Sequence, residues 1–184
     1  HLLVNQDGSR FIFLHRWRGP DDRSFITRML TAGMDGKDVR VVDPHERTSH
    51  FIWRDPRHIL AWAGHPSYGD AFYLYEDKPD GMVEVVGKDI MTVNGHCTYL
   101  PGNRWIVNDT YPDKERMQKV YLYEVATGKT VTLGKFYSPP EYAGEWRVDT
   151  HPRVSPQGDL LCIDSPHTGE GRQMHLVDLR GVVG

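Results

Sequence analysis

Short apolar runs recur along this 184-residue chain, and a turn precedes each of them. Four such runs cover residues 11–14, 59–62, 105–107 and 160–163. The turns before them end at Gly8, His58, Asn103 and Gly158, at intervals of about 45–55 residues. This period is typical of folds in which one supersecondary unit is repeated.

Further strand signals follow each of these runs. Alternating apolar segments at 28–30 and 39–42, at 72–75 and 83–86, and at 120–123 and 131–133 flank turns that contain Gly36, Gly81 and Gly128. The fourth repeat offers one such segment, 174–179, before the last residues of the sequence. Period-two alternation around Asp-Gly or Thr-Gly predicts β-hairpins, so each full repeat offers about four strands.

The pattern predicts an all-β fold, a β-propeller with about four blades of four antiparallel strands. We expect the blades near residues 1–43, 44–88, 89–136 and 146–182 of a single propeller segment that covers 1–184. A β-sandwich is the alternative, but it gives no reason for turns and histidines to keep their register. The abrupt first and last repeats lead us to interpret the chain as part of a larger propeller.

No segment keeps an apolar i, i+3, i+4, i+7 spacing over three turns, so no long helix is expected. Residues 18–25, 111–118 and 137–148 are irregular and are predicted to form surface loops. The 18 glycines, 12 prolines and 11% aromatic residues suit a turn-rich β protein.

Charge and composition exclude several kinds of partner. A formal net charge of −3 with dispersed Lys and Arg predicts no nucleic-acid partner. No apolar run approaches the roughly 20 residues of a membrane helix, so no membrane partner is expected. The two cysteines, Cys97 and Cys162, are too few for a disulfide framework. A reducing, cytoplasmic location is favoured, although a missing N-terminus would leave room for a signal peptide.

A histidine keeps its place in all four repeats, at His1, His50, His96 and His151. In a propeller these side chains belong to the innermost strand or to the loop that enters it. Imidazole is the commonest metal ligand and a frequent general base. The alternative is that each histidine is a structural hydrogen-bonding group that ties blades together.

Four short motifs resemble the oligogalacturonate lyases. The first two are Thr27-Arg28-Met29-Leu30 and Ser49-His50-Phe51-Ile52-Trp53. The others are Asn94-Gly95-His96-Cys97, and Asp149-Thr150-His151-Pro152-Arg153 ahead of a Ser-Pro-x-Gly turn. The resemblance implies a seven-bladed propeller that cleaves short unsaturated galacturonides by β-elimination with bound manganese. It also implies that Arg28 and His50 are catalytic and that His96 and His151 are metal ligands.

The chain departs from the family at two ligand positions. The family's Gln-x-x-His-x-His segment reads Val148-Asp149-Thr150-His151-Pro152-Arg153 here, so Val148 replaces the glutamine and Arg153 the last histidine. Asp149 is a candidate oxygen donor, and His1 and His15 are candidates from other blades. Manganese prefers about six oxygen or nitrogen ligands, so two imidazoles alone are too few.

The resemblance predicts a lyase with a divalent cation, Mn²⁺ above all, and an acidic oligosaccharide as substrate. β-Elimination beside a uronate requires a neutralised carboxylate and a base. Arginine suits carboxylates through its fork of donors, so Arg16, Arg147 and Arg153 are candidate substrate-binding residues. The alternatives are ion pairs of Arg28 with Asp22 or Asp35, and of Arg147 with Glu145 or Asp149.

Other reaction classes lack their motifs. Gly-x-Ser-x-Gly is absent, which argues against a serine hydrolase, and no phosphate-binding glycine loop opens a helix. The second function hypothesis is a non-catalytic propeller that binds a carbohydrate or a protein, because two ligand positions are replaced. Propeller folds host many functions, so the fold alone does not decide between the two.

Overall fold

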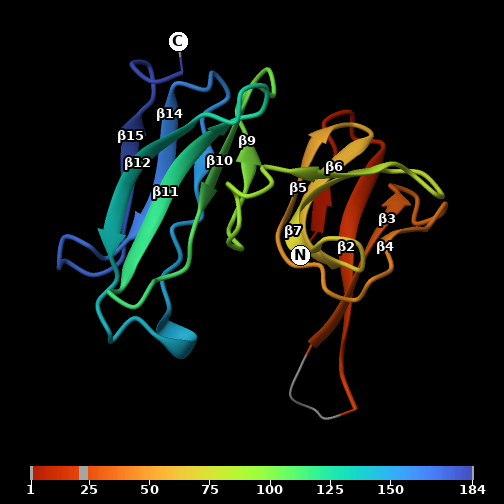
Figure 1. Ribbon diagram of the computed structural model, residues 1–184, viewed down its shortest axis with the longest axis horizontal. Coiled ribbons are helices and arrows are strands. Elements are labelled where there is room, and N and C mark those ends of the chain that lie inside the picture. Colours follow the sequence, from red (N-terminus) through yellow and green to blue (C-terminus); the bar gives the residue numbers. More distant parts are fainter. Residues whose placement is uncertain (1, 21–24, 184) are drawn as a thin grey trace. The chain divides into compact units, whose positions relative to one another are not determined.

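The computed structural model describes residues 2–20 and 25–183. The described residues form fifteen β-strands and one short 3₁₀ turn, Gly144–Trp146. Contacts divide the chain into two compact units, His1–Thr92 and Val93–Gly184. Each unit contains two antiparallel sheets (Figure 1).

Unit 1 contains two four-stranded sheets whose strands follow one another in sequence order. The first sheet consists of β1 (Leu2–Val4), β2 (Arg10–Arg18), β3 (Phe25–Gly33) and β4 (Arg40–Asp43). The second consists of β5 (Phe51–Asp55), β6 (His58–His65), β7 (Gly69–Glu76) and β8 (Val83–Val86). Every pairing is antiparallel, as in a propeller blade.

Unit 2 repeats this plan with one strand fewer. One sheet consists of β9 (Thr98–Tyr99), β10 (Trp105–Asp109), β11 (Met117–Glu124) and β12 (Thr130–Tyr137). The other has three described strands, β13 (Arg153–Val154), β14 (Leu160–Ser165) and β15 (Gln173–Asp178). The all-β fold class with four-stranded antiparallel blades is therefore confirmed, and the fourth sheet has three strands within the described residues.

The predicted turns are made by residues in the left-handed region. Gly8, Gly36, Gly128 and Gly158 all have φ between 71° and 79°. Glycine adopts this conformation without the steric penalty of a Cβ atom, and this allows the tight reversal between antiparallel strands.

Each unit has its own apolar core between its two sheets. In unit 1, Ile12 and Met29 of the first sheet pack with Ile59, Tyr73 and Tyr75 of the second. Trp53 also bridges the sheets, because its indole N–H donates to the carbonyl of Leu3 at 3.0 Å.

In unit 2, Val107 and Leu122 of one sheet pack with Leu161 and Ile163 of the other. Burial of each such side chain contributes about 1.5–3 kcal/mol. The sheets of each unit are therefore held together by the apolar face of the strands.

The hairpin of β2 and β3 is longer than the apolar runs predicted. The pairing continues from Arg10↔Gly33 to Arg18↔Phe25, because polar and aromatic residues keep the alternation beyond Leu14. Figure 1 shows the two strands continuing beyond the rest of their sheet. Much of the loop predicted at 18–25 falls on residues 21–24, which lie outside the described residues.

Candidate functional site

Three histidines hold the same place in successive sheets. His50 directly precedes β5, His96 lies two residues before β9, and His151 lies two residues before β13. His1, the fourth member of the series, lies outside the described residues. The recurrence therefore follows the blade, because each of the three stands at the entrance to the first strand of its sheet.

His96 is oriented by a buried carboxylate of the same unit. Asp109 ends β10 and is 1% exposed. Its Oδ1 accepts the backbone N–H of His96 at 2.6 Å, and its Oδ2 lies 3.0 Å from His96 Nδ1. An ionised carboxylate can only accept hydrogen bonds, so Nδ1 carries the hydrogen and Nε2 carries the lone pair of the neutral ring.

Gly95 makes this approach possible. A Cβ atom at residue 95 would lie 2.0 Å from the carbonyl oxygen of Asp109 and 2.8 Å from one of its carboxylate oxygens. No real side chain tolerates such distances, so the Asn94-Gly95-His96 segment requires glycine for a structural reason.

Asp109 also fixes the backbone around His151. Its Oδ2 accepts the Thr150 hydroxyl at 2.6 Å and the His151 N–H at 3.2 Å. His151 has φ = 40°, a region that residues other than glycine seldom adopt, and these hydrogen bonds hold it there. Burial alone raises the pKa of Asp109, but the hydrogen bonds and charge from His96 and the bond from Thr150 lower it below its usual range.

The two imidazoles lie side by side. The ring centroids of His96 and His151 are 3.9 Å apart, with an interplanar angle of 47°. Burial, and then the nearby His96, lower the pKa of His151 below its ordinary value. A lowered pKa favours the neutral imidazole, which is the form that binds metals.

Asp149 completes a group of three possible ligands. One ligand atom from each of His96, Asp149 and His151 lies within 4.8 Å of the other two. The Oδ1 atom of Asp149 is buried and accepts no hydrogen bond, although Arg147 Nε lies 2.8 Å away. The Oδ2 atom accepts Arg147 Nη2 at 2.9 Å.

These residues fit a divalent cation. Two imidazoles and a carboxylate are a donor set that first-row divalent ions use, and an orphaned buried oxygen favours a positive charge beside it. The carboxylate of Asp109 behind His96 is the outer-shell contact that orients metal-binding histidines. Arg147 competes for Asp149, because its guanidinium already balances that carboxylate.

The other predicted residues of unit 2 have structural contacts. Arg147 is the Asp149 ion-pair partner, and its guanidinium carbon lies 4.8 Å from the ring centroid of Tyr111. Arg153 is exposed and donates to the carbonyl of Pro152 at 3.1 Å. Val148, which stands at the family's glutamine position, is 2% exposed and offers no ligand atom.

Arg28, His50 and Arg16 belong to unit 1. His50 Nδ1 lies 3.3 Å from the Ser49 hydroxyl. Arg28 lies opposite His15 in the β2–β3 hairpin, and Arg16 lies opposite Thr27. Since neighbouring residues of a strand point to opposite faces, Arg16 and Arg28 lie on opposite faces of the hairpin.

The residues that organise the site carry little signal in the sequence. Asp109, Thr150 and Tyr111 were not singled out, and Asp109 is separated from its two partner segments by 13 and 42 residues. The signal in the sequence is faint: an Asn-Asp pair ends a strand whose first three residues are apolar. Asp149 was recognised as a candidate oxygen donor only because it lies two residues before His151.

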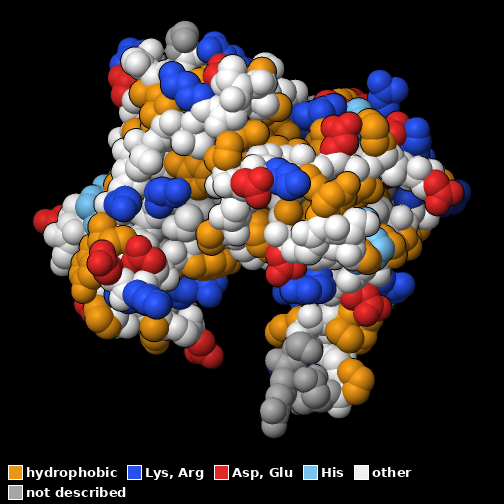
Figure 2. Space-filling view, viewed as in Figure 1, with side chains coloured by type: hydrophobic (Ala, Val, Ile, Leu, Met, Phe, Trp, Pro, Cys, Tyr) orange, Lys and Arg blue, Asp and Glu red, His pale blue; other side chains and the backbone are white. Residues whose placement is uncertain are grey.

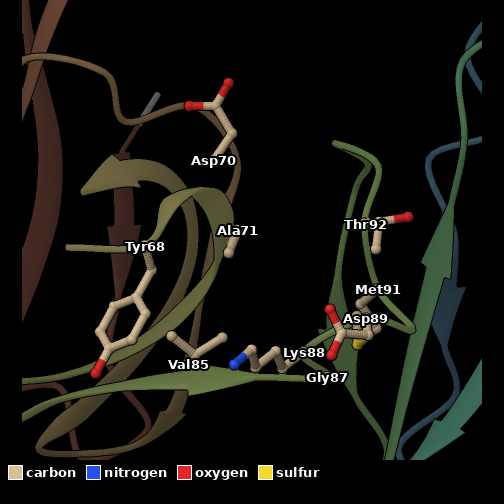
Figure 3. A pocket seen from close by; sticks show the side chains of 9 residues that line it. All are labelled: Tyr68, Asp70, Ala71, Val85, Gly87, Lys88, Asp89, Met91 and Thr92. Carbon is tan, nitrogen blue, oxygen red and sulfur yellow. The ribbon is translucent and has the colours of Figure 1, made fainter. Parts of the chain in front are cut away.

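One pocket of unit 1 contains none of the predicted site residues. It lies between β7, β8 and the turn after β8 (Figure 3). Figure 3 shows Lys88 extending toward Val85, with Asp89 near Lys88 and Tyr68 on the other side of Val85. The pocket mixes both charges with apolar atoms, which does not define one kind of ligand. Its lining consists of Tyr68, Asp70, Ala71, Val85, Gly87, Lys88, Asp89, Met91 and Thr92.

The surface agrees with the dispersed charges of the sequence. On the face shown in Figure 2, Lys and Arg side chains are interspersed with Asp and Glu. Among the residues that the structure describes, no helix is long and apolar enough to cross a membrane.

Comparison with solved structures identifies the fold. TolB from Acinetobacter baumannii superposes with a TM-score of 0.71 at 18% identity, over 94% of this chain and 40% of that one. An oligogalacturonate lyase in complex with manganese gives a TM-score of 0.63 at 14% identity, over 98% of this chain and 50% of the lyase. This chain is a β-propeller protein.

A third propeller similarity is more partial. The tricorn protease gives a TM-score of 0.60 at 9% identity, over 97% of this chain and 21% of that chain. The propeller chain thus spans half or less of the length of each of these structures. No protein-family model matches it, and no curated protein sequence matches it either. At these identities the likeness shows the fold alone.

Proposed function

We propose that this propeller is part of a lyase that cleaves short acidic oligosaccharides, oligogalacturonides, by β-elimination with a divalent cation. The observation that carries the proposal is the grouping of His96, Asp149 and His151 within 4.8 Å of one another. Two of the three stand where the family resemblance implies metal ligands. The chain also shares its fold with an oligogalacturonate lyase in complex with manganese, which is compatible with this function.

Manganese is the proposed ion. Bound by His96, Asp149 and His151, it would neutralise a uronate carboxylate and make the adjacent C–H more acidic. Asp109 holds His96 in the tautomer that presents Nε2, and burial keeps His151 neutral at pH 7. Asp149 takes the place of one of the two replaced family ligands.

The arginines and His50 have the remaining proposed roles. His50 takes the proton from the carbon beside the uronate carboxylate, a role that suits an imidazole near neutral pH. The carbon–carbon double bond forms as the bond to the glycosidic oxygen breaks, and that oxygen leaves as a hydroxyl after it receives a proton. Arg28 binds a carboxylate through its fork of donors, and Arg16 and Arg153 are further candidate substrate contacts. Arg147 acts on the cation site through Asp149, because the two are already paired.

The test combines manganese binding with product formation. Equilibrium dialysis of the wild-type chain against Mn²⁺ should give one ion per chain, and His96→Ala should weaken the affinity by about 100-fold or more. His58→Ala is the matched control, since His58 also lies beside a carboxylate, Asp55, at 2.8 Å but in unit 1. That variant should bind manganese as the wild type does.

Product formation from unsaturated digalacturonate is then measured by mass spectrometry in the presence of Mn²⁺. His50→Ala should remove it while the ion stays bound. A chain that binds no manganese, or a His50→Ala variant as active as the wild type, would contradict the proposal.

A non-catalytic propeller that binds a carbohydrate or a protein is the second candidate. The pairing of Arg147 with Asp149, together with Val148 and Arg153 at two family ligand positions, favours it. Under this alternative the chain binds digalacturonate or a protein without converting it, and manganese has no effect on binding.

A further inference from the structure

Most arginines with described side-chain contacts face a carboxylate. The pairs are Arg10 and Arg40 with Asp38 and Asp77, Arg47 with Asp70, Arg54 with Asp55, Arg104 with Glu124, Arg147 with Asp149, Arg172 with Asp164, and Arg180 with Asp178. Such pairing is the ordinary way to balance a permanent positive charge.

The guanidinium of Arg28 has neighbours of another kind. Its Nη2 atom lies 3.0 Å from Nδ1 of His15, its cross-strand neighbour in the β2–β3 hairpin. Its guanidinium carbon lies 5.2 Å from the ring centroid of Trp17. Within residues 2–20 and 25–183, no carboxylate lies within ion-pair distance of Arg28. Among these described residues, the positive charge therefore has an imidazole and an aromatic face as its neighbours, and no carboxylate.

The contact with His15 fixes the roles of the atoms. An arginine side chain can only donate, so His15 Nδ1 must accept, and the proton of the neutral ring sits on Nε2. His15 and Trp17 lie on the same face of β2 with ring centroids 4.8 Å apart. Together they hold the guanidinium beside the two rings.

The arrangement leaves hydrogen-bond donors unused. Arg28 Nε is buried and has no acceptor, and an unsatisfied donor of this kind costs about 1–3 kcal/mol. His15 is exposed and Arg28 is half-buried, so the terminal nitrogens remain accessible to a ligand. A planar anion at these nitrogens would supply the missing negative charge through two parallel hydrogen bonds.

We propose that His15, Trp17 and Arg28 form a carboxylate-binding subsite on the β2–β3 hairpin that takes a uronate residue of an oligosaccharide. Arg28 binds the carboxylate, Trp17 supplies an apolar face, and His15 is the positioning residue that aligns the guanidinium. The subsite needs no metal ion. It rests on the proposed function only for the identity of the anion as a uronate.

Isothermal titration calorimetry with digalacturonate tests this subsite, in EDTA so that the cation site does not contribute. Arg28→Lys keeps the charge but loses the fork and should weaken binding about tenfold or more. His15→Phe keeps the ring beside Trp17 but removes the acceptor, so it should weaken binding less than Arg28→Lys. His15→Gln restores an acceptor and should recover most of the lost affinity.

Two controls separate the subsite from general effects of charge. Arg47→Lys changes an arginine of the same unit that is already paired with Asp70 and should bind as the wild type does. His96→Ala should also bind normally in EDTA, so failure of the manganese proposal leaves this result unchanged.

Three outcomes would overturn the subsite. The first is Arg28→Lys binding as tightly as the wild type. The second is equal affinity for the methyl ester of digalacturonate, which lacks the charge. The third is displacement by inorganic phosphate at the same concentration as the sugar, which would make the site a general oxyanion site. A His15→Gln variant as weak as His15→Phe would refute the positioning role of His15.

Discussion

A buried carboxylate collects polar contacts in each unit, and the two carboxylates are balanced in different ways. In unit 1, Asp77 accepts Arg10 Nε at 2.7 Å and the Thr31 hydroxyl at 2.6 Å, with Arg40 Nη1 at 3.4 Å. In unit 2, Asp109 accepts from His96, from Thr150 and from the backbone of His151. Blades of the same design therefore carry a saturated ion-pair network in one unit and a histidine network in the other.

The difference lies in what each network can still do. Arginine keeps its proton at any pH that the fold survives, so the arginines around Asp77 offer no nitrogen lone pair to a metal ion. Imidazole can lose its proton and offer a lone pair, so the network around Asp109 can hold a metal ion. The repeated strands supply the scaffold, and the residues at the strand ends decide whether a network is structural or chemical.

Removal of each carboxylate gives the largest expected effect. Asp77→Ala leaves two guanidinium groups without their buried counter-ion and should cost unit 1 about 3–5 kcal/mol of unfolding free energy. Asp109→Ala leaves hydrogen-bond donors unsatisfied but no permanent charge, and should cost unit 2 about 1–3 kcal/mol. Urea unfolding gives the free energies, and hydrogen exchange read by mass spectrometry locates the loss.

The proposed difference between the two networks is contradicted if Asp109→Ala lowers the unfolding free energy more than Asp77→Ala does. It also fails if Asp77→Ala reduces exchange protection in residues 93–184 as much as in 1–92. Arg47 and Asp70 form a more exposed pair, 65% and 47% exposed, and Asp70→Ala is the control for a change of charge alone. That variant should lose no more than about 1 kcal/mol.

The next effect separates the two networks by cation affinity. Asp109→Asn keeps the size of the side chain but loses the charge that orients His96, so Mn²⁺ affinity should fall about 10–100-fold. Asp77→Asn should leave the affinity unchanged. Equilibrium dialysis measures both variants, and an equal affinity of Asp109→Asn and the wild type would remove Asp109 from the cation site.

The strands and turns could be predicted from the sequence because they depend on local alternation. Period-two apolar runs locate the strands, and Gly8 and Gly158 adopt the left-handed conformation that the predicted turns need. The hairpin of β2 and β3 is longer than predicted, since His15 and Trp17 continue β2, and Phe25 and Thr27 begin β3, with polar and aromatic side chains. Hydrophobicity alone does not detect a strand of that kind.

The site was accessible to sequence reasoning only in part. The register of His96 and His151 was visible because the blade repeats, and the structure brings the two rings together. The role of Asp109 was not visible, because its contacts depend on how β10 lies beside the segment before β13. The pairing of Arg147 with Asp149 was one of two alternatives that spacing alone left open.

The smallest expected effect is a pH dependence confined to unit 2. Because burial and His96 lower the pKa of His151, the unfolded chain binds a proton at this ring in a pH range where the folded chain does not. The free energy of unfolding should therefore fall as the pH drops below the ordinary histidine value of 6.5. One proton bounds the slope at about 1.4 kcal/mol per pH unit.

His151→Gln removes this titration and should reduce the slope of the profile measured by urea unfolding between about pH 5 and 7.5, a range that brackets the ordinary histidine pKa. His167, whose pKa is also lowered by burial and then by His175, is the matched control in the same unit.

The variants His151→Gln and His167→Gln should differ in how much Mn²⁺ raises their unfolding free energy. Mn²⁺ should stabilise His167→Gln more at pH 7 than at pH 5, because protons compete with the ion for His96 and His151. It should stabilise His151→Gln at neither pH, and a pH-dependent stabilisation of that variant by manganese would separate the titrating histidine from the cation site.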